Sequence, residues 1–221
     1  MPGPFDPGFE DLPDEIPIFP LGGALLLPHS RLPLNIFEPR YLNMTAAALA
    51  APRRLIGMIL PREGAGGGEP DIYRTGCAGR IVSFGETEDG RYLITLKGLI
   101  RFVVERELSL RDGYRRVRAR FGVFRDDLME PPAQIPLDRE RLLNALRAYL
   151  GQQGVEANWE AIEGTGDSRL VDSLAMMCPF RTSEKQALLE AAGTAERAEI
   201  VMTLLEMALL ERPDDEGRTR Q

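Results

Sequence analysis

Hydrophobic residues follow two different periods along this chain of 221 residues. Up to about residue 124, short apolar runs rich in β-branched and aromatic residues are bounded by Gly, Pro and Asp, which is typical of β-strands. From about residue 136, apolar residues recur every three to four positions, as they do on one face of an α-helix. The pattern therefore predicts a β-rich part followed by a helical part.

Four segments of the first half carry the strand pattern most clearly, namely 54–60, 77–86, 91–107 and 114–124. Asp89-Gly90 suits a tight hairpin turn between the second and the third, because both residue types tolerate positive φ. In the last segment Arg116, Arg118 and Arg120 alternate with apolar side chains. This alternation predicts a strand with one buried face and one solvated face.

A single helix is predicted to interrupt these strands. Pro39 suits a first helical turn, apolar residues then recur at helical spacing, and Pro52 stops the run. In the second half, helices are predicted within 142–150, 157–164, 168–178, 182–193 and 201–209. We therefore expect a β-rich domain over residues 12–124, a Pro-rich linker over 125–135 and a helical bundle over 136–212.

Composition changes this picture little, since 43% of residues are hydrophobic and 28% are charged, as in ordinary globular proteins. No apolar stretch reaches the roughly 18 residues of a membrane span, and the acidic, Pro-rich N-terminus is unlike a secretory signal. We expect a cytoplasmic protein without a membrane partner. Cys77 and Cys178 lie far apart without a CxxC, which predicts two buried thiols rather than a disulfide or a zinc site.

Sequence motifs for catalysis are missing. No G-x-x-x-x-G-K-[ST] loop occurs. His29, the single histidine, is followed by Ser30 in an extended segment, where neighbouring side chains point to opposite faces. Ser183 and Lys185 are two positions apart on a predicted helix and diverge. We expect no enzymatic activity, no catalytic residues, no metal site and no cofactor.

Several segments, taken in order, resemble the N-terminal substrate-binding domain of Lon proteases. They are "IPIFPLGGALLLPHSRLPLNIFEPRY" (residues 16–41), "IGMILP" and "PDIYRTGCAGRIVSFGETEDGRYLITLKGLIRFVV". The similarity covers roughly residues 14–124, and the helical part to about 212 resembles the extension of small standalone bacterial members. The resemblance implies an α+β fold, with an N-terminal PUA-like β-barrel that holds one embedded helix, followed by a C-terminal α-helical bundle.

The same resemblance implies a non-catalytic module that binds unfolded or degron-bearing polypeptides, one form being an adaptor that presents clients to a separate protease. Phe37, Arg40 and Tyr41 are the candidate peptide-binding residues. Pro33 and Pro39 stiffen their segment, and these side-chain types are enriched at binding hot spots. The competing interpretation is that the two rings pack inside and Arg40 bonds local carbonyls.

RNA binding by a PUA-like barrel is the main alternative, with Arg116, Arg118 and Arg120 contacting phosphates. The net charge of −7 argues against a nucleic-acid partner, and the arginine row is more simply the solvated face of a strand. A small hydrolase would need a nucleophile and a base that the sequence does not offer. A further alternative is a domain that binds no ligand of its own and serves oligomeric assembly. The sequence predicts neither the oligomeric state nor the client.

Overall fold

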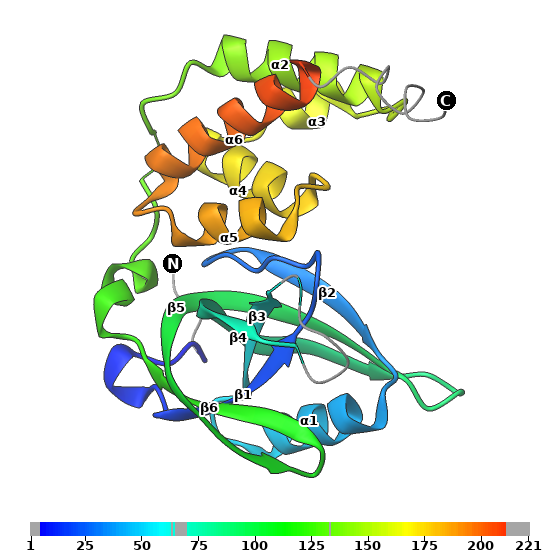
Figure 1. Ribbon diagram of the computed structural model, residues 1–221, viewed down its shortest axis with the longest axis vertical. Helices are drawn as coiled ribbons and strands as arrows, with labels where there is room; N and C mark the ends of the chain where they lie inside the picture. Colours follow the sequence, from blue (N-terminus) through cyan, green and yellow to red (C-terminus); the bar gives the residue numbers. More distant parts are fainter. Residues whose placement is uncertain (1–4, 63, 65–69, 133, 211–221) are drawn as a thin grey trace, which may run out of the picture. The chain divides into compact units, whose positions relative to one another are not determined.

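The computed structural model describes residues 5–62, 64, 70–132 and 134–210 (Figure 1). Its strands are β1 (Glu15–Pro20), β2 (Arg31–Ile36), β3 (Leu55–Pro61), β4 (Ile72–Glu86), β5 (Tyr92–Arg111) and β6 (Tyr114–Arg120). Its α-helices are α1 (Pro39–Ala50), α2 (Arg139–Gln152), α3 (Trp159–Glu163), α4 (Asp167–Met177), α5 (Thr182–Glu190) and α6 (Thr194–Leu210), and two 3-10 helices are η1 (Phe9–Asp11) and η2 (Gly122–Leu128). The order of elements confirms the predicted α+β fold class.

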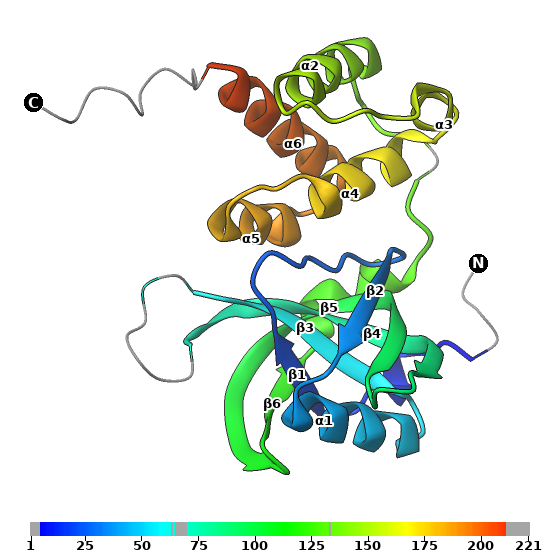
Figure 2. The same cartoon turned by 90° about the vertical axis from the view of Figure 1, so that its right-hand side faces the viewer.

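The strands form one sheet that nearly closes into a ring (Figure 2). The strand order is β2-β5-β4-β3-β1-β6, and β5 pairs with β6 as well. Residues 92–103 of β5 pair with β4, whereas residues 103–111 pair with β6. One long strand therefore closes the ring. Within the described part of the chain β2 pairs with β5 alone, so it is an edge strand.

Strand β1 contains two prolines, Pro17 and Pro20, and nevertheless lies inside the sheet, between β3 and β6. It pairs in parallel with β3, at the register Ile18 to Gly57, whereas the other ladders are antiparallel. A parallel pair needs a long crossover connection, and the segment between β1 and β3, which contains α1, provides it.

The ring of Phe102 fills the centre of the barrel and is fully buried. It lies over two glycines, since a Cβ at Gly76 would be 2.5 Å from this ring and one at Gly57 would be 2.9 Å away. The core around it includes Ile16, Ile18, Leu55, Ile59, Ala78, Ile100 and Val117. Small residues on β3 and β4 thus make room for one large aromatic side chain on β5.

Helix α1 begins at the predicted proline and packs against β1, β3 and β6. Tyr41, Met44, Thr45 and Ala48 form its buried face. The ring of Tyr41 lies 4.1 Å from that of Phe19 on β1. This packing holds the helix on the sheet and fixes the direction in which its remaining faces point.

The chain divides into two compact units, Met1–Pro131 with Met176–Glu190, and Pro132–Ala175 with Ala191–Gln221. The first unit contains α5, which the sequence placed in the helical bundle over 136–212. Helix α5 packs against β3 and β4. Its buried Lys185 donates to the carbonyl of Gly23 at 2.6 Å, and Gln186 donates to the carbonyl of Thr75 at 3.2 Å.

The second unit is helical, and in it α2 packs against α6. A buried ion pair joins two of its helices, since Arg197 of α6 donates to Asp172 of α4 at 2.6 Å. Across the described ranges, none of the helices combines the length and the apolar composition that crossing a membrane requires.

Both cysteines are free and buried, which confirms the prediction made for them. Burial raises the pKa of the Cys178 thiol to about 11. The thiol is therefore protonated at neutral pH, whereas the nucleophilic form of cysteine is the thiolate.

Arg101 ties β5 to η2 and to α5. Its buried guanidinium donates to both carboxylate oxygens of Asp127 at 2.7 and 2.8 Å, and to the carbonyl of Leu189 at 3.0 Å. The backbone N–H of Arg101 also donates to Asp127 at 2.9 Å, and the guanidinium lies 4.4 Å from the ring centre of Phe124. The cluster around Arg101 therefore connects the closed sheet to η2 and to the end of α5.

We predict that Arg101→Met lowers the free energy of unfolding by about 3–5 kcal/mol, because Asp127 would be left as an uncompensated buried charge. Denaturant unfolding measures this loss. Arg106→Met is the matched control, since Arg106 is exposed on the same strand and its side chain has no partner among the described residues. The control should change stability by less than about 0.5 kcal/mol. Equal effects of the two substitutions would contradict the proposed role of Arg101.

Candidate functional site

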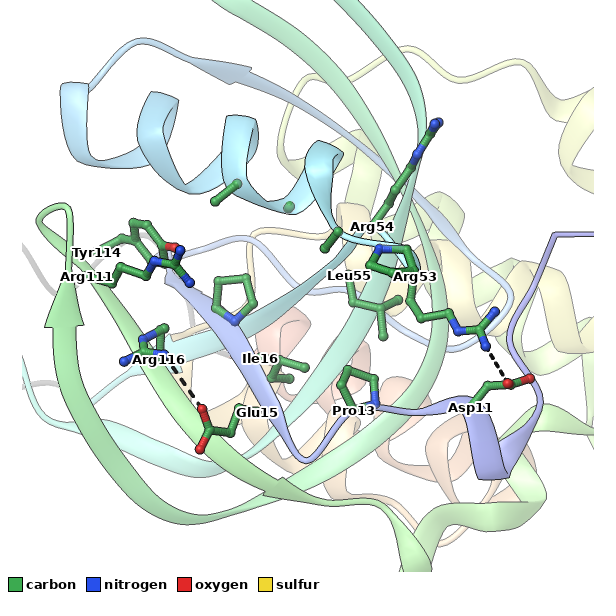
Figure 3. Close-up of a pocket in the computed structure, with 15 residues that line it drawn as sticks. Asp11, Pro13, Glu15, Ile16, Arg53, Arg54, Leu55, Arg111, Tyr114 and Arg116 are labelled. Atoms are coloured by element: carbon green, nitrogen blue, oxygen red, sulfur yellow. Dashed lines mark hydrogen bonds and ion pairs between the residues drawn. The ribbon is translucent and has the colours of Figure 1, made fainter.

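A groove runs along the carboxyl-terminal half of α1 (Figure 3). It encloses about 490 Å³ and lies between α1, β1, the start of β3 and β6. Its apolar lining consists of Pro13, Ile16, Pro17, Ala47, Ala48, Ala51, Pro52, Leu55 and Tyr114. Alanine side chains end at Cβ, so the helix leaves a hollow at a place where larger residues would fill the space.

Charged residues of both signs border this groove. Arg53 forms an ion pair with Asp11, and Arg116 lies 3.6 Å from Glu15 (Figure 3). Arg111, also in the lining, is exposed near the turn between β5 and β6. The site therefore combines an apolar floor with polar edges, which is the usual character of a surface that receives apolar side chains and hydrogen-bonds the polar groups around them.

The structure separates the three candidate peptide-binding residues. The side chain of Phe37 is 62% exposed, whereas that of Tyr41 is 8% exposed and packs in the core. Arg40 is exposed, lies 2.8 Å from the carboxylate of Glu38, and places its guanidinium 4.6 Å from the ring centre of Tyr41. A ligand on this surface would contact Phe37 and Arg40. Tyr41 would not contact the ligand, but its ring packs against the guanidinium of Arg40.

Arg40 and the groove are connected through the turn between β5 and β6. Asn43 of α1 donates to the carbonyl of Asp112 at 3.0 Å, and a Cβ at Gly113 would lie 3.3 Å from the Cβ of Arg40. The next residue, Tyr114, lines the groove. The turn between β5 and β6 therefore contacts the amino-terminal half of α1 and continues into the lining of the groove beside the carboxyl-terminal half.

Further exposed apolar side chains lie on the hairpin of β4 and β5. Phe37 directly follows Ile36, which pairs with Tyr92. The next residue of β5, Leu93, is 49% exposed. Phe84 of β4 is 45% exposed and packs edge-on against Tyr92, with ring centres 5.0 Å apart. Because successive side chains of a strand alternate between its faces, Leu93 lies on the opposite face of β5 from Tyr92 and Phe84.

The arginines considered for RNA binding share one strand but not one environment. Arg116 and Arg118 each lie 3.6 Å from the carboxylate of Glu15 on β1. Arg120 is exposed, and its side chain has no partner within the part of the chain that the structure describes. The alternating residues Val117 and Ala119 are buried, which confirms the predicted two-faced strand.

The groove itself was not found from the sequence, although the signal was present. The run "AAALAAP" places Ala47 and Ala48 in the last turns of α1 and Ala51 at its C-cap. Small residues on a helix that packs against a sheet indicate either close packing or a hollow. Only the position of β1 and β6 decides between these outcomes.

Comparison with known proteins identifies the relatives of this chain. A family model, described as the ATP-dependent protease La (LON) substrate-binding domain, matches residues 15–207. Lon protease 2 of Thermus thermophilus is 29% identical over 206 residues, which cover 90% of this chain and 25% of that protein. Lon protease of Escherichia coli K12 is 24% identical over 198 residues, covering 87% of this chain and 24% of that protein. The chain spans about a quarter of the length of these relatives.

Two solved structures share the fold. The Lon N-terminal domain protein from Xanthomonas campestris has a TM-score of 0.58 and 22% identity, and covers 86% of this chain and 97% of that one. The N-terminal domain of the Mycobacterium avium complex Lon protease has a TM-score of 0.58 and 16% identity, with coverages of 87% and 98%. Because the family model matches from β1 into α6, the chain belongs to the family of Lon substrate-binding domains.

Proposed function

We propose that this chain is a non-catalytic polypeptide-binding module that holds an apolar side chain of an unfolded or degron-bearing segment in the α1 groove. The observation that carries the proposal is the groove itself, with an alanine and proline floor and charged edges. The family description, a substrate-binding domain of a protease, supports a polypeptide as the ligand.

The groove suits this role because its walls are held rigidly. Tyr41 and Met44 anchor α1 on the sheet, and Pro17 stiffens the strand on the opposite side. A preorganised surface loses little conformational entropy when a ligand binds. Burial of one leucine or phenylalanine side chain contributes about 1.5–3 kcal/mol, which is enough for weak, reversible capture of many sequences.

Phe37 and Arg40 extend the proposed contact along the helix. Helix α1 has 12 residues, which corresponds to a length of about 18 Å at 1.5 Å per residue. An extended peptide covers about 3.3 Å per residue, so five or six residues would reach from the groove to Phe37. In this arrangement Tyr41 positions Arg40 and does not touch the peptide.

An adaptor role follows as the finer form of the proposal. The relatives are named Lon protease, so a domain of this family forms part of proteolytic enzymes. We propose that this chain presents captured segments to a protease in the cytoplasm. Its own residues then bind and position the client, and no catalytic step is assigned to them.

Filling the groove should weaken polypeptide binding. We predict that Ala51→Phe reduces the affinity for a labelled, reduced and carboxymethylated lactalbumin about tenfold, because the new ring would occupy the space of the client side chain. Fluorescence anisotropy measures the affinity. Ala50→Phe is the matched control, since Ala50 is an exposed neighbour on α1 outside the groove lining. Equal affinities of the two variants would exclude the groove as the binding site.

Removing the exposed ring beside the groove should have a similar effect. We predict that Phe37→Ala weakens binding of the same substrate by about 1–2 kcal/mol, or roughly 5- to 30-fold. Because Phe37 is 62% exposed, the thermal unfolding midpoint should hardly change. Tyr41→Ala, by contrast, should lower stability by about 3 kcal/mol, as expected for a core aromatic residue. Unchanged binding by Phe37→Ala would remove this residue from the site.

RNA binding should be weak and nonspecific. We predict that replacing Arg116, Arg118 and Arg120 together by Gln changes affinity for a single-stranded RNA less than about twofold at physiological salt, since Glu15 lies 3.6 Å from both Arg116 and Arg118 and offsets part of their charge. Three phosphate contacts would instead give a slope of about −2 to −3 in log affinity against log salt. A slope of that size, flattened in the triple variant, would favour the RNA alternative.

A further inference from the structure

A row of three cations crosses the sheet outside the lining of the α1 groove, and the basic surface around this row borders the groove at Arg53 and Arg54. Lys97 of β5 lies directly opposite Arg31 of β2 on one side and opposite Arg80 of β4 on the other. Directly opposite residues of neighbouring strands place their side chains on the same face. Like charges in such positions destabilise a sheet. This row therefore needs a compensating anion.

Two further arginines extend the positive charge of this surface. Arg53 and Arg54 precede β3, and they line one crevice together with Arg80. The side chain of Arg54 has no hydrogen bond or ion pair to any described residue, and its backbone has a positive φ of 52°. The chain as a whole carries a net charge of −7, so five cations gathered here are a local exception.

An acidic segment near the N-terminus occupies this surface. We call Phe5–Asp11, with the sequence FDPGFED, the strap. The carboxylate of Asp6 is only 7% exposed; it lies 2.5 Å from the Nζ of Lys97 and 3.7 Å from the guanidinium of Arg80. Asp11 forms an ion pair with Arg53. Two carboxylates thus face the five cations, and positive charge remains in excess.

Aromatic contacts accompany the charge pairs of the strap. The guanidinium of Arg80 lies 5.6 Å from the ring centre of Phe5, and that of Arg125 lies 4.3 Å from the ring centre of Phe9. Glu10 also lies 3.4 Å from Arg125. The strap lies outside residues 15–207, the part that the family model matches.

Open space remains on both sides of Asp6. One crevice, of about 530 Å³, is lined by Phe5, Asp6, Asp11, Pro52, Arg53, Arg54 and Arg80. A second, of about 280 Å³, lies between Asp6, Pro7, His29, Lys97 and Leu128. The strap therefore covers the basic surface without filling it, and a segment with more carboxylates would fit the same surface better.

We propose that the basic surface formed by Arg31, Arg53, Arg54, Arg80 and Lys97 is a docking site for an acidic, aromatic-containing segment of another polypeptide, and that the strap occupies this site in the isolated chain. The strap defines the ligand chemistry, because it is a short peptide segment, ending in η1, whose carboxylates and rings contact guanidinium and ammonium groups. A tethered occupant competes with a free one at an effective concentration in the millimolar range. An acidic partner segment must therefore displace it.

The test weakens the strap by substitution and supplies its sequence as a free peptide. The full-length chain carries Asp6→Asn, Glu10→Gln and Asp11→Asn together, and a fluorescein-labelled FDPGFED peptide is titrated at low ionic strength. We expect the triple variant to bind the peptide about tenfold more tightly than the natural chain does, since the internal competitor is weakened. Adding Arg80→Gln and Lys97→Gln should abolish the gain, and salt should reduce it.

Two controls separate the proposed site from a general change in charge. Asp14→Asn, Glu88→Gln and Glu105→Gln together remove the same number of charges from exposed residues whose side chains have no partner in the described ranges. This variant should bind the peptide as the natural chain does. The neutral peptide FNPGFQN should bind neither variant measurably.

The proposal is overturned if the strap variant gains no affinity, if the control variant gains as much, or if the neutral peptide binds equally well. Tighter binding of a twelve-nucleotide single-stranded RNA than of the peptide would also overturn it and assign the surface to nucleic acid. Denaturant unfolding of each variant verifies that the folded chain is compared. Phe37 lies outside the lining of both crevices, so Phe37→Ala should leave peptide binding unchanged, and a failure here is distinguishable from a failure of the proposed function.

Discussion

The dual pairing of strand β5 is the constraint on which the first unit depends. One strand pairs with β2 and β4 along its first half and with β6 along its second, so the sheet has to close. Closure is feasible because Gly57 and Gly76 leave room for the ring of Phe102 at the centre. The same closure places β6 beside α1, and it sets Lys97 between Arg31 and Arg80. Both proposed binding surfaces therefore follow from the path of one strand.

Hydrogen bonds of buried polar groups fix the positions of η2 and α5 on the sheet, which hydrophobic burial alone would not specify. Arg101 joins β5 to Asp127 and to the end of α5, while Lys185 and Gln186 donate to carbonyls of Gly23 and Thr75. Burial lowers the pKa of Lys185, and the carbonyl groups that accept from its Nζ offset part of this cost. Hydrogen bonds from these buried donors specify one docking position, because any shift leaves the donors unpaired.

Strands β3 to β6, α1 and the helices of the second half could be predicted from hydrophobic period and from Gly and Pro positions, because these are local properties. No strand was predicted for the segments that form β1 and β2. The place of α5 could not be predicted, since Lys185 and Gln186 are usually solvent-exposed residues and only their distant carbonyl partners make them buried. The sequence left two alternatives for Phe37 and Tyr41, namely exposure at a binding surface or packing of both rings inside. The structure exposes Phe37 and buries Tyr41, so neither alternative holds for both residues. The groove depends on how β1 and β6 approach α1, which no local pattern encodes.

Capture of polypeptide in the α1 groove is the central claim, and photo-crosslinking from the groove rim tests it most directly. A benzophenone amino acid would replace Arg111, an exposed residue of the lining, and in a second protein Val155, which is 54% exposed in the helical unit. Both proteins are irradiated with an unfolded, labelled substrate. The account predicts strong crosslinks from position 111 and weak ones from position 155. Equal crosslinking from the two positions, or none from position 111, would contradict it.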